Sequence, residues 1–193
     1  TMHQSSLGTM MVVVGNKLSP IWQTQFLPLF FLLTAILMGF AIVVWEGVLS
    51  TTSFNRASEN HILKKIAGIM MTVGAAFLGG QAVLARQLQA LTGPMSCWFW
   101  LETLLMAGGV ALLVPKANRS LSRALFISSS MLLLAGIFYR LNVYLIGYTP
   151  AIGPWSYFPA FKEIMITVGI FALEIALSLI FVKTLPVLHA PHA

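Results

Sequence analysis

The sequence has very few charged side chains and a single cysteine. Only 8% of its 193 residues are charged, whereas about a quarter are charged in ordinary soluble domains. All five acidic residues are glutamates. Because Cys97 has no second cysteine to pair with, an internal disulfide and a cysteine-ligated iron–sulfur or zinc site within this sequence are excluded. An iron–sulfur centre would therefore have to be held by a partner chain.

Hydrophobic residues dominate what is present. They make up 58% of the chain, and the mean hydropathy is +0.88, values typical of an integral membrane protein. The formal net charge of +6 comes from basic residues scattered over short connections. Since these residues do not form one basic face, the charge does not indicate a nucleic-acid partner.

Five apolar stretches are long enough to cross a bilayer, which takes about 20 helical residues. They predict an all-α integral membrane protein, a bundle of about five transmembrane helices forming a single domain over residues 1–193. The run 7–14 is apolar but too short to span, so it is predicted to be interfacial, re-entrant or the edge of a longer segment. The five predicted spans are 27–49, 66–85, 95–114, 124–146 and 163–185.

The connections predict an orientation. Lysine and arginine gather between the first and second spans and between the third and fourth. The positive-inside rule then places these connections and the C-terminus in the cytoplasm. The HQSS segment at residues 3–6 and the aromatic loop before the last span are predicted to face outward.

Most of the glutamates lie inside the predicted spans or at their ends, where a charge is costly unless it is paired, hydrated or neutralised. Glu46 and Glu174 are the candidate proton-path carboxylates, because a carboxylate in a medium of low dielectric constant can exchange protons near neutral pH. The structural alternative is that Arg140 forms an ion pair with Glu102 or Glu163 and ties helices together.

A second set of residues is predicted to bind a quinone or to form an ion-pair cluster near the outward face. An outward polar cluster can hydrogen-bond a quinone carbonyl, although such a cluster is also typical of a helix cap. No predicted span contains a histidine, so a facing histidine pair for a b-type haem is not expected within this chain. The set comprises His3, Gln4, Arg86, Glu102, Arg140, Tyr157 and Glu163.

The order of several motifs resembles the NrfD-like (polysulfide reductase) membrane family, and in particular the membrane subunits of respiratory nickel-iron hydrogenases. The resemblance covers essentially the whole chain and is carried by HQSSLG at 3–8, WEG at 45–47, YRLN at 139–142, YFPAFKE at 157–163 and LPVL at 185–188. Members usually have eight to ten helices. This chain therefore resembles the C-terminal half, with the N-terminal half expected to be missing or to be a separate chain.

The resemblance implies a subunit of a respiratory oxidoreductase in the bacterial inner membrane. Such a subunit passes electrons from a ferredoxin-like iron–sulfur partner, itself joined to the large and small nickel-iron hydrogenase subunits, to menaquinone or ubiquinone. It implies no haem or iron–sulfur centre bound by this chain, and a proton-transfer role for Glu46. His3 and Arg140 also lie in the matching motifs.

Two other functions stay open at this stage. A proton-coupled transporter would use the same carboxylates, although the sequence has no internal inverted repeat of the kind common in transporters. A passive anchor would only pack against catalytic subunits. The sequence also leaves open whether the chain itself reduces quinone or is a non-catalytic subunit.

Overall fold

The computed structural model describes residues 2–19, 21–54, 60–85, 96–115, 122–148 and 160–184. Within these ranges the regular elements are helices, apart from one isolated antiparallel bridge between Leu18 and Tyr148. The predicted all-α class is confirmed. The elements in chain order are α1 (Met2–Val14), η1 (Gly15–Lys17), α2 (Leu27–Phe54), α3 (Asn60–Ala85), α4 (Ser96–Leu113), α5 (Ser122–Leu141), the π-helix η4 (Asn142–Ile146) and α6 (Phe161–Thr184).

Five of the helices in these ranges are long and apolar enough to cross a membrane, namely α2, α3, α4, α5 together with η4, and α6. Their number agrees with the predicted bundle of about five transmembrane helices. α2 continues past its apolar stretch into polar residues and ends at Phe54. There the hydroxyls of Thr51 and Thr52 both donate to the carbonyl of Val48, each at 2.9 Å. The chain is a multi-pass membrane protein.

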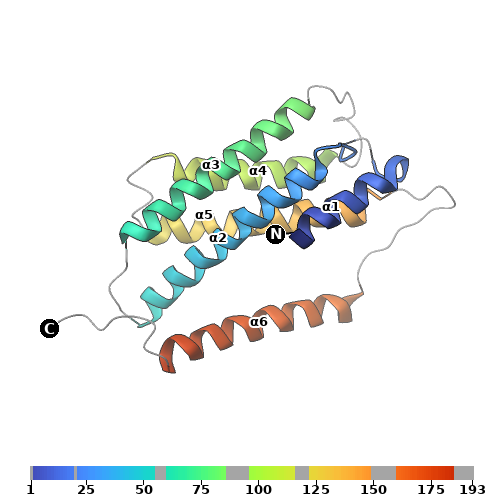
Figure 1. Ribbon diagram of the computed structural model, residues 1–193. Helices are drawn as coiled ribbons and strands as arrows, with labels where there is room; N and C mark the ends of the chain where they lie inside the picture. Colours follow the sequence, from blue (N-terminus) through green and yellow to red (C-terminus); the bar gives the residue numbers. More distant parts are fainter. Residues whose placement is uncertain are drawn as a thin grey trace.

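α1 is a regular helix that packs against α2, so the run 7–14 belongs to a helix beginning at Met2 (Figure 1). The two backbones come close at Gly8, where an added Cβ would lie 2.7 Å from the Cα of Pro28. A turn through Gly15, whose φ is 61°, reverses the chain between α1 and α2. The end of α1 is tied to the end of α5 and η4, because Ser19 donates its backbone N–H to the carbonyl of Gly147 at 2.6 Å.

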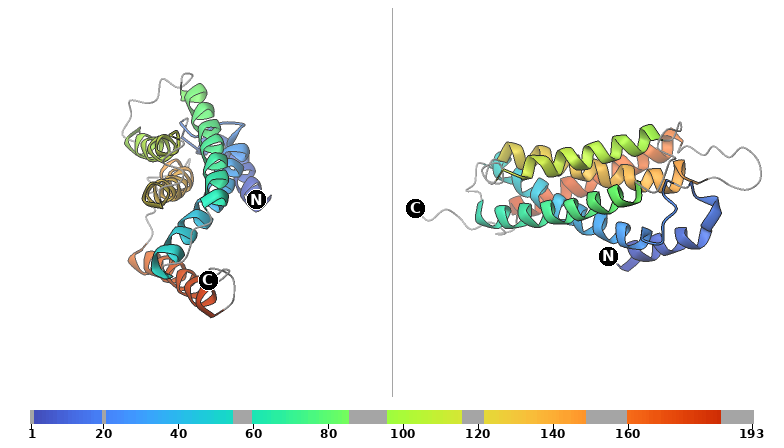
Figure 2. Two further views of the ribbon diagram at one scale, coloured as in Figure 1. Left: turned by 90° about the vertical axis from the view of Figure 1, so that its left-hand side faces the viewer. Right: turned by 90° about the horizontal axis from the view of Figure 1, so that it is seen from above.

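α2, α3, α4 and α5 form the packed bundle, with α4 against α5 and α2 in contact with both α3 and α5 (Figure 2). Small residues allow α4 and α5 to approach: the Oγ of Ser128 donates to the carbonyl of Gly109 at 2.8 Å. Aromatic rings fill the centre. The ring of Tyr139 lies 5.1 Å from that of Phe77 and 5.5 Å from that of Phe31, which joins α5 to α3 and α2.

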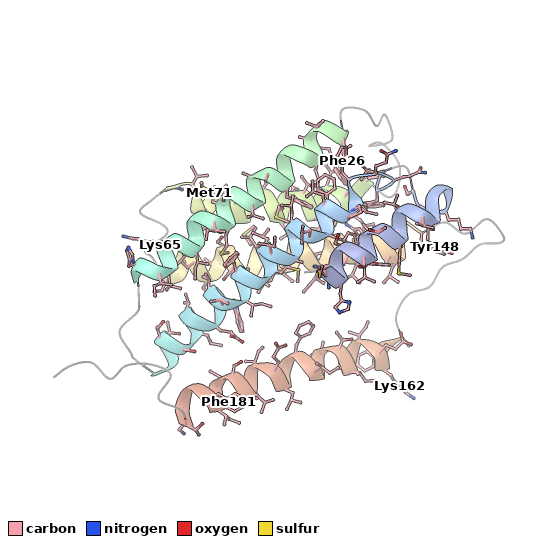
Figure 3. The ribbon with its side chains drawn as sticks, in the orientation of Figure 1. Phe26, Lys65, Met71, Tyr148, Lys162 and Phe181 are labelled. Carbon is pink, nitrogen blue, oxygen red and sulfur yellow. The ribbon has the colours of Figure 1, made fainter. Side chains whose placement is uncertain are left out.

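α6 stands apart from the bundle in Figure 1 and in the left view of Figure 2, and it approaches the bundle near the C-terminal end of α2. Nearly all of its described side chains are exposed. Figure 3 places Lys162 and Phe181 at opposite ends of this helix, with Tyr148 toward the Lys162 end and Lys65 toward the Phe181 end. The bundle therefore has one end where α1 meets α2 and α5 finishes, and another where α3 starts.

Candidate functional site: a buried polar cluster in the helical bundle

Glu102, in the second turn of α4, is fully buried and is held by two side-chain amides. Its exposed fraction is 0%. One carboxyl oxygen, Oε1, lies 2.6 Å from Nε2 of Gln81 on α3, and the other receives a hydrogen bond from Nδ2 of Asn142 in η4. Three elements far apart in the sequence thus bring polar side chains to one point. We call these three residues the amide–carboxyl triad.

Asn142 is positioned by the change from α-helix to π-helix at the end of α5. In η4 the N–H of Gly147 bonds to the carbonyl of Asn142, five residues back, at 2.6 Å. Such wider turns are frequent at functional sites, because they re-aim a side chain without ending the helix. The side chain of Asn142 also donates to the carbonyl of Trp98 on α4 at 3.1 Å, so it links α5 to α4 twice.

Arg140 forms a second polar group at the same end of the bundle. Its Nε donates to Oε1 of Gln4 on α1 at 3.2 Å, and its Nη1 contacts the sulfur of Met38 on α2 and the carbonyl of Gly136. The hydrogen bond to Gln4 crosses 136 residues of sequence. Tyr139, the neighbour of Arg140 in the chain, is buried among the rings of Phe31 and Phe77.

The predicted ion pair between Arg140 and Glu102 is wrong, because each of the two side chains has other partners. The carboxyl group of Glu102 meets the amides of Gln81 and Asn142, and Arg140 donates to an amide oxygen, a thioether and a backbone carbonyl. The reason is geometric: successive residues point in different directions from a helix, so Arg140 faces α1 and α2 while Asn142, two residues later, faces α4.

Glu46 lies where α2 meets α6. It is partly buried, and the Oγ of Ser178 donates to its Oε1 at 3.0 Å. A small pocket opens beside this contact, lined by side chains of both helices, including Trp45 and Ile175. This hydrogen bond is a polar contact between two helices whose other side chains at this pocket are mostly apolar.

The remaining predicted residues are spread out. Glu174 is exposed on α6, one turn before Ser178. Glu163 is exposed in the first turn of α6, where its Oε2 accepts the N–H of Ala160 at 3.2 Å as a helix cap does. His3 is exposed beside Gln4 near the start of α1. Arg86 and Tyr157 lie outside the described residues.

Sequence reasoning missed Gln81, Asn142 and Met38. None of these three side chains is ionisable, so none of them carries the charge that pointed to the other residues. A signal was present for the two amides, because Gln81 and Asn142 stand within long apolar stretches, where an uncharged polar side chain usually bonds across helices. Ser178 carries the same kind of signal in α6.

The fold and the site define a polytopic helical membrane protein with a polar cluster buried at one end of its bundle. No family model and no solved structure matches the chain. The chain is 36% identical, over 97% of its length, to the "Probable Ni/Fe-hydrogenase 2 b-type cytochrome subunit" of Escherichia coli K12. It is 28% identical, over 98% of its length, to a protein of Nitratidesulfovibrio vulgaris Hildenborough whose name states no function.

These comparisons correct two expectations. The NrfD-like family assignment is not supported, because no family model matches and the named relative is a hydrogenase b-type cytochrome subunit. The expectation that this chain binds no haem is contradicted by that same name, which is that of a b-type cytochrome subunit. The chain spans about half the length of both relatives, 50% and 52%.

The described histidines can be tested against a b-type haem, which needs axial ligands on opposite sides of its iron. His3 precedes Gln4, whose partner Arg140 contacts Met38 of α2. His61 lies in the first turn of α3, where nearby Leu63 packs against Gly47 of α2.

Met38 thus marks the level of His3 along α2, and Gly47 marks the level of His61. These two positions are nine residues apart, about 14 Å along a helix. The described histidines therefore do not form a facing pair, and His189 and His192 lie outside the described residues.

Proposed function

We propose that the chain is a membrane-integral part of a respiratory oxidoreductase of the hydrogenase type, which passes electrons from an iron–sulfur partner to a membrane quinone. The observation that carries this proposal is the 36% identity, over almost the whole chain, to a hydrogenase b-type cytochrome subunit. The partners would be a ferredoxin-like iron–sulfur subunit and the large and small nickel-iron hydrogenase subunits. The membrane would be the bacterial inner membrane.

The distribution of basic residues supports a cytoplasmic C-terminus. At the end of the bundle where α3 and α5 begin and α6 finishes, the described residues include Lys64, Lys65, Arg123 and Lys183. Such an excess of positive charge is typical of the cytoplasmic side. The triad and Arg140 would then lie toward the outward face, nearer to an iron–sulfur subunit outside the membrane.

Arg140 and Gln4 are the residues we propose for contact with the quinone. A guanidinium group and an amide can each donate a hydrogen bond to a quinone carbonyl, and the two side chains already meet between α1, α2 and α5. His3 stands next to Gln4 and is exposed, so it is available to a ligand arriving from the lipid.

Glu46 and Glu174 are the residues we propose for proton transfer. The contact between Glu46 and Ser178 places a carboxyl group and a hydroxyl group together between α2 and α6. Glu174 lies four residues before Ser178, and residues with this spacing share one face of a helix. A proton moving along the side of α6 that faces α2 would meet these three groups in turn.

The test is a Glu46→Gln variant in the purified hydrogenase complex. We expect hydrogen-dependent reduction of a soluble quinone analogue to fall, because glutamine keeps the size and the hydrogen bond to Ser178 but cannot release a proton. Co-purification of the iron–sulfur and nickel-iron subunits measures assembly separately.

The control is Lys162→Gln, which changes an exposed charged side chain in the first turn of α6. It is expected to keep full turnover. Unchanged turnover in Glu46→Gln would remove Glu46 from the mechanism, and a complex without nickel-iron subunits would refute the hydrogenase assignment.

A further inference from the structure

The amide–carboxyl triad places an acidic group in the bundle interior without a cationic partner among the described residues. The exposed fractions are 0% for Glu102 and Asn142 and 7% for Gln81. Both hydrogen bonds of the carboxyl group are with neutral amides. An ionised carboxylate in such a place is strongly disfavoured unless something compensates for the charge.

The nearest ionisable groups do not supply that compensation. On α5, Tyr139 carries no positive charge in either protonation state, and Arg140 directs its hydrogen bonds toward α1 and α2. On α3, the nearest described lysine is Lys65, 16 residues before Gln81 and therefore about 24 Å away along the helix. On α4 itself, Cys97 is exposed.

The orientation of Asn142 is determined by a third partner. Its Nδ2 lies 3.1 Å from the carbonyl oxygen of Trp98, which can only accept a hydrogen bond. The Asn142 atom facing both Trp98 and Glu102 must therefore be the nitrogen. Asn142 donates to Oε2 of Glu102 whatever the state of the acid.

Gln81 has no such anchor. Its oxygen is buried without a hydrogen-bond partner, while its nitrogen lies 2.6 Å from Oε1 of Glu102. The nitrogen and oxygen of an amide have nearly the same shape, so the group can be turned over in place.

We propose that Glu102 is a neutral carboxylic acid whose Oε1–H donates to the amide oxygen of Gln81, so that the triad is an internal proton-binding site. This arrangement removes the buried charge and gives the oxygen of Gln81 a donor, while the amide nitrogen of Gln81 takes the position that the oxygen held. The hydrogen bond from Asn142 to Oε2 remains. The site holds one exchangeable proton, and it is separate from Glu46, which lies between α2 and α6.

The experiment is infrared spectroscopy of the full chain in lipid nanodiscs at neutral pH. A protonated carboxyl group has a C=O stretching band well separated from the bands of carboxylates. We expect such a band in the unaltered protein and its loss in Glu102→Gln. We expect it to move to higher frequency in Gln81→Leu, because the acid then loses its acceptor. A matched control is Gln23→Leu, an exposed glutamine before α2, which should leave the band unchanged.

Two results would overturn the proposal. In the first, Glu102→Gln removes only carboxylate bands, which would show that the group is ionised. In the second, the band is present but does not move in Gln81→Leu, which would show that Gln81 does not accept the proton. Neither readout depends on hydrogenase activity, and the second variant keeps Glu102 itself in place.

Discussion

The close approach of α1 to α2 at Gly8 can be tested with a single methyl group. In Gly8→Ala the new Cβ would lie 2.7 Å from Cα and 3.0 Å from the nitrogen of Pro28, and 3.1 Å from the carbonyl oxygen of Leu27. All three are backbone atoms, so no side-chain rotation relieves the overlap. The helix α1 must move away from α2.

Two opposing terms determine the size of the effect. Alanine is favoured over glycine in a helix by about 1 kcal/mol, while forcing an extra carbon into a tight contact costs about 1–3 kcal/mol. Because the contact at Gly8 is with backbone, we expect the upper part of that range and a net loss of about 1–2 kcal/mol. Gln4, one turn before Gly8, should also lose its hydrogen bond to Arg140.

The matched variant is Gly79→Ala. Gly79 is exposed on α3, and an added Cβ would meet nothing within 4 Å. We therefore expect this variant to be as stable as the unaltered protein or more stable, by up to about 1 kcal/mol. Unfolding of both variants in the same nanodiscs measures the difference. Equal stability of Gly8→Ala and Gly79→Ala would refute the close packing of α1 on α2.

Two hydroxyl groups that bond across helices, those of Ser128 and Ser178, give further predictions. Ser128→Ala removes an interhelical bond to the carbonyl of Gly109 and should lower the free energy of unfolding by about 0.6 kcal/mol, the average for such bonds in membranes. Ser130→Ala removes only a bond within α5 and should change it less, a comparison made by denaturant unfolding in mixed micelles. Ser178→Ala removes the bond to Glu46 and should speed hydrogen–deuterium exchange in α6, and an unchanged exchange rate would show that this bond does not hold α6 near α2.

The spans could be predicted because a helix that crosses the bilayer needs an apolar stretch as long as the hydrocarbon core is thick, and such a stretch is visible in the sequence. A helix such as α2 must be apolar over the whole hydrocarbon thickness, whatever its neighbours are. The ends of the helices were harder, since Thr51 and Thr52 are polar yet remain helical by bonding to carbonyls of their own helix. Hydropathy predicts which residues lie in the hydrocarbon core, but it does not predict at which residue a helix ends.

The partners of the buried polar groups could not be predicted in the same way. Charge alone suggested that Arg140 would meet a glutamate, but the direction of each side chain depends on the rotation of its helix and on the crossing of its neighbours. The π-helix η4 is an example, because it brings Asn142 to Glu102. The residues 142–146 show no pattern that predicts a π-helix.

The amino-acid sequence by itself determined that this protein is a helical membrane protein with about five spans and a few ionisable groups at membrane depth, because hydrophobic length and charge are local properties of the chain. Only the tertiary structure decided which groups meet: Glu102 with two amides, Arg140 with Gln4 and Met38, and Glu46 with Ser178. Most of these pairings join helices that are distant in sequence. They arise from helix packing, which depends on the shapes of all the contacting side chains together.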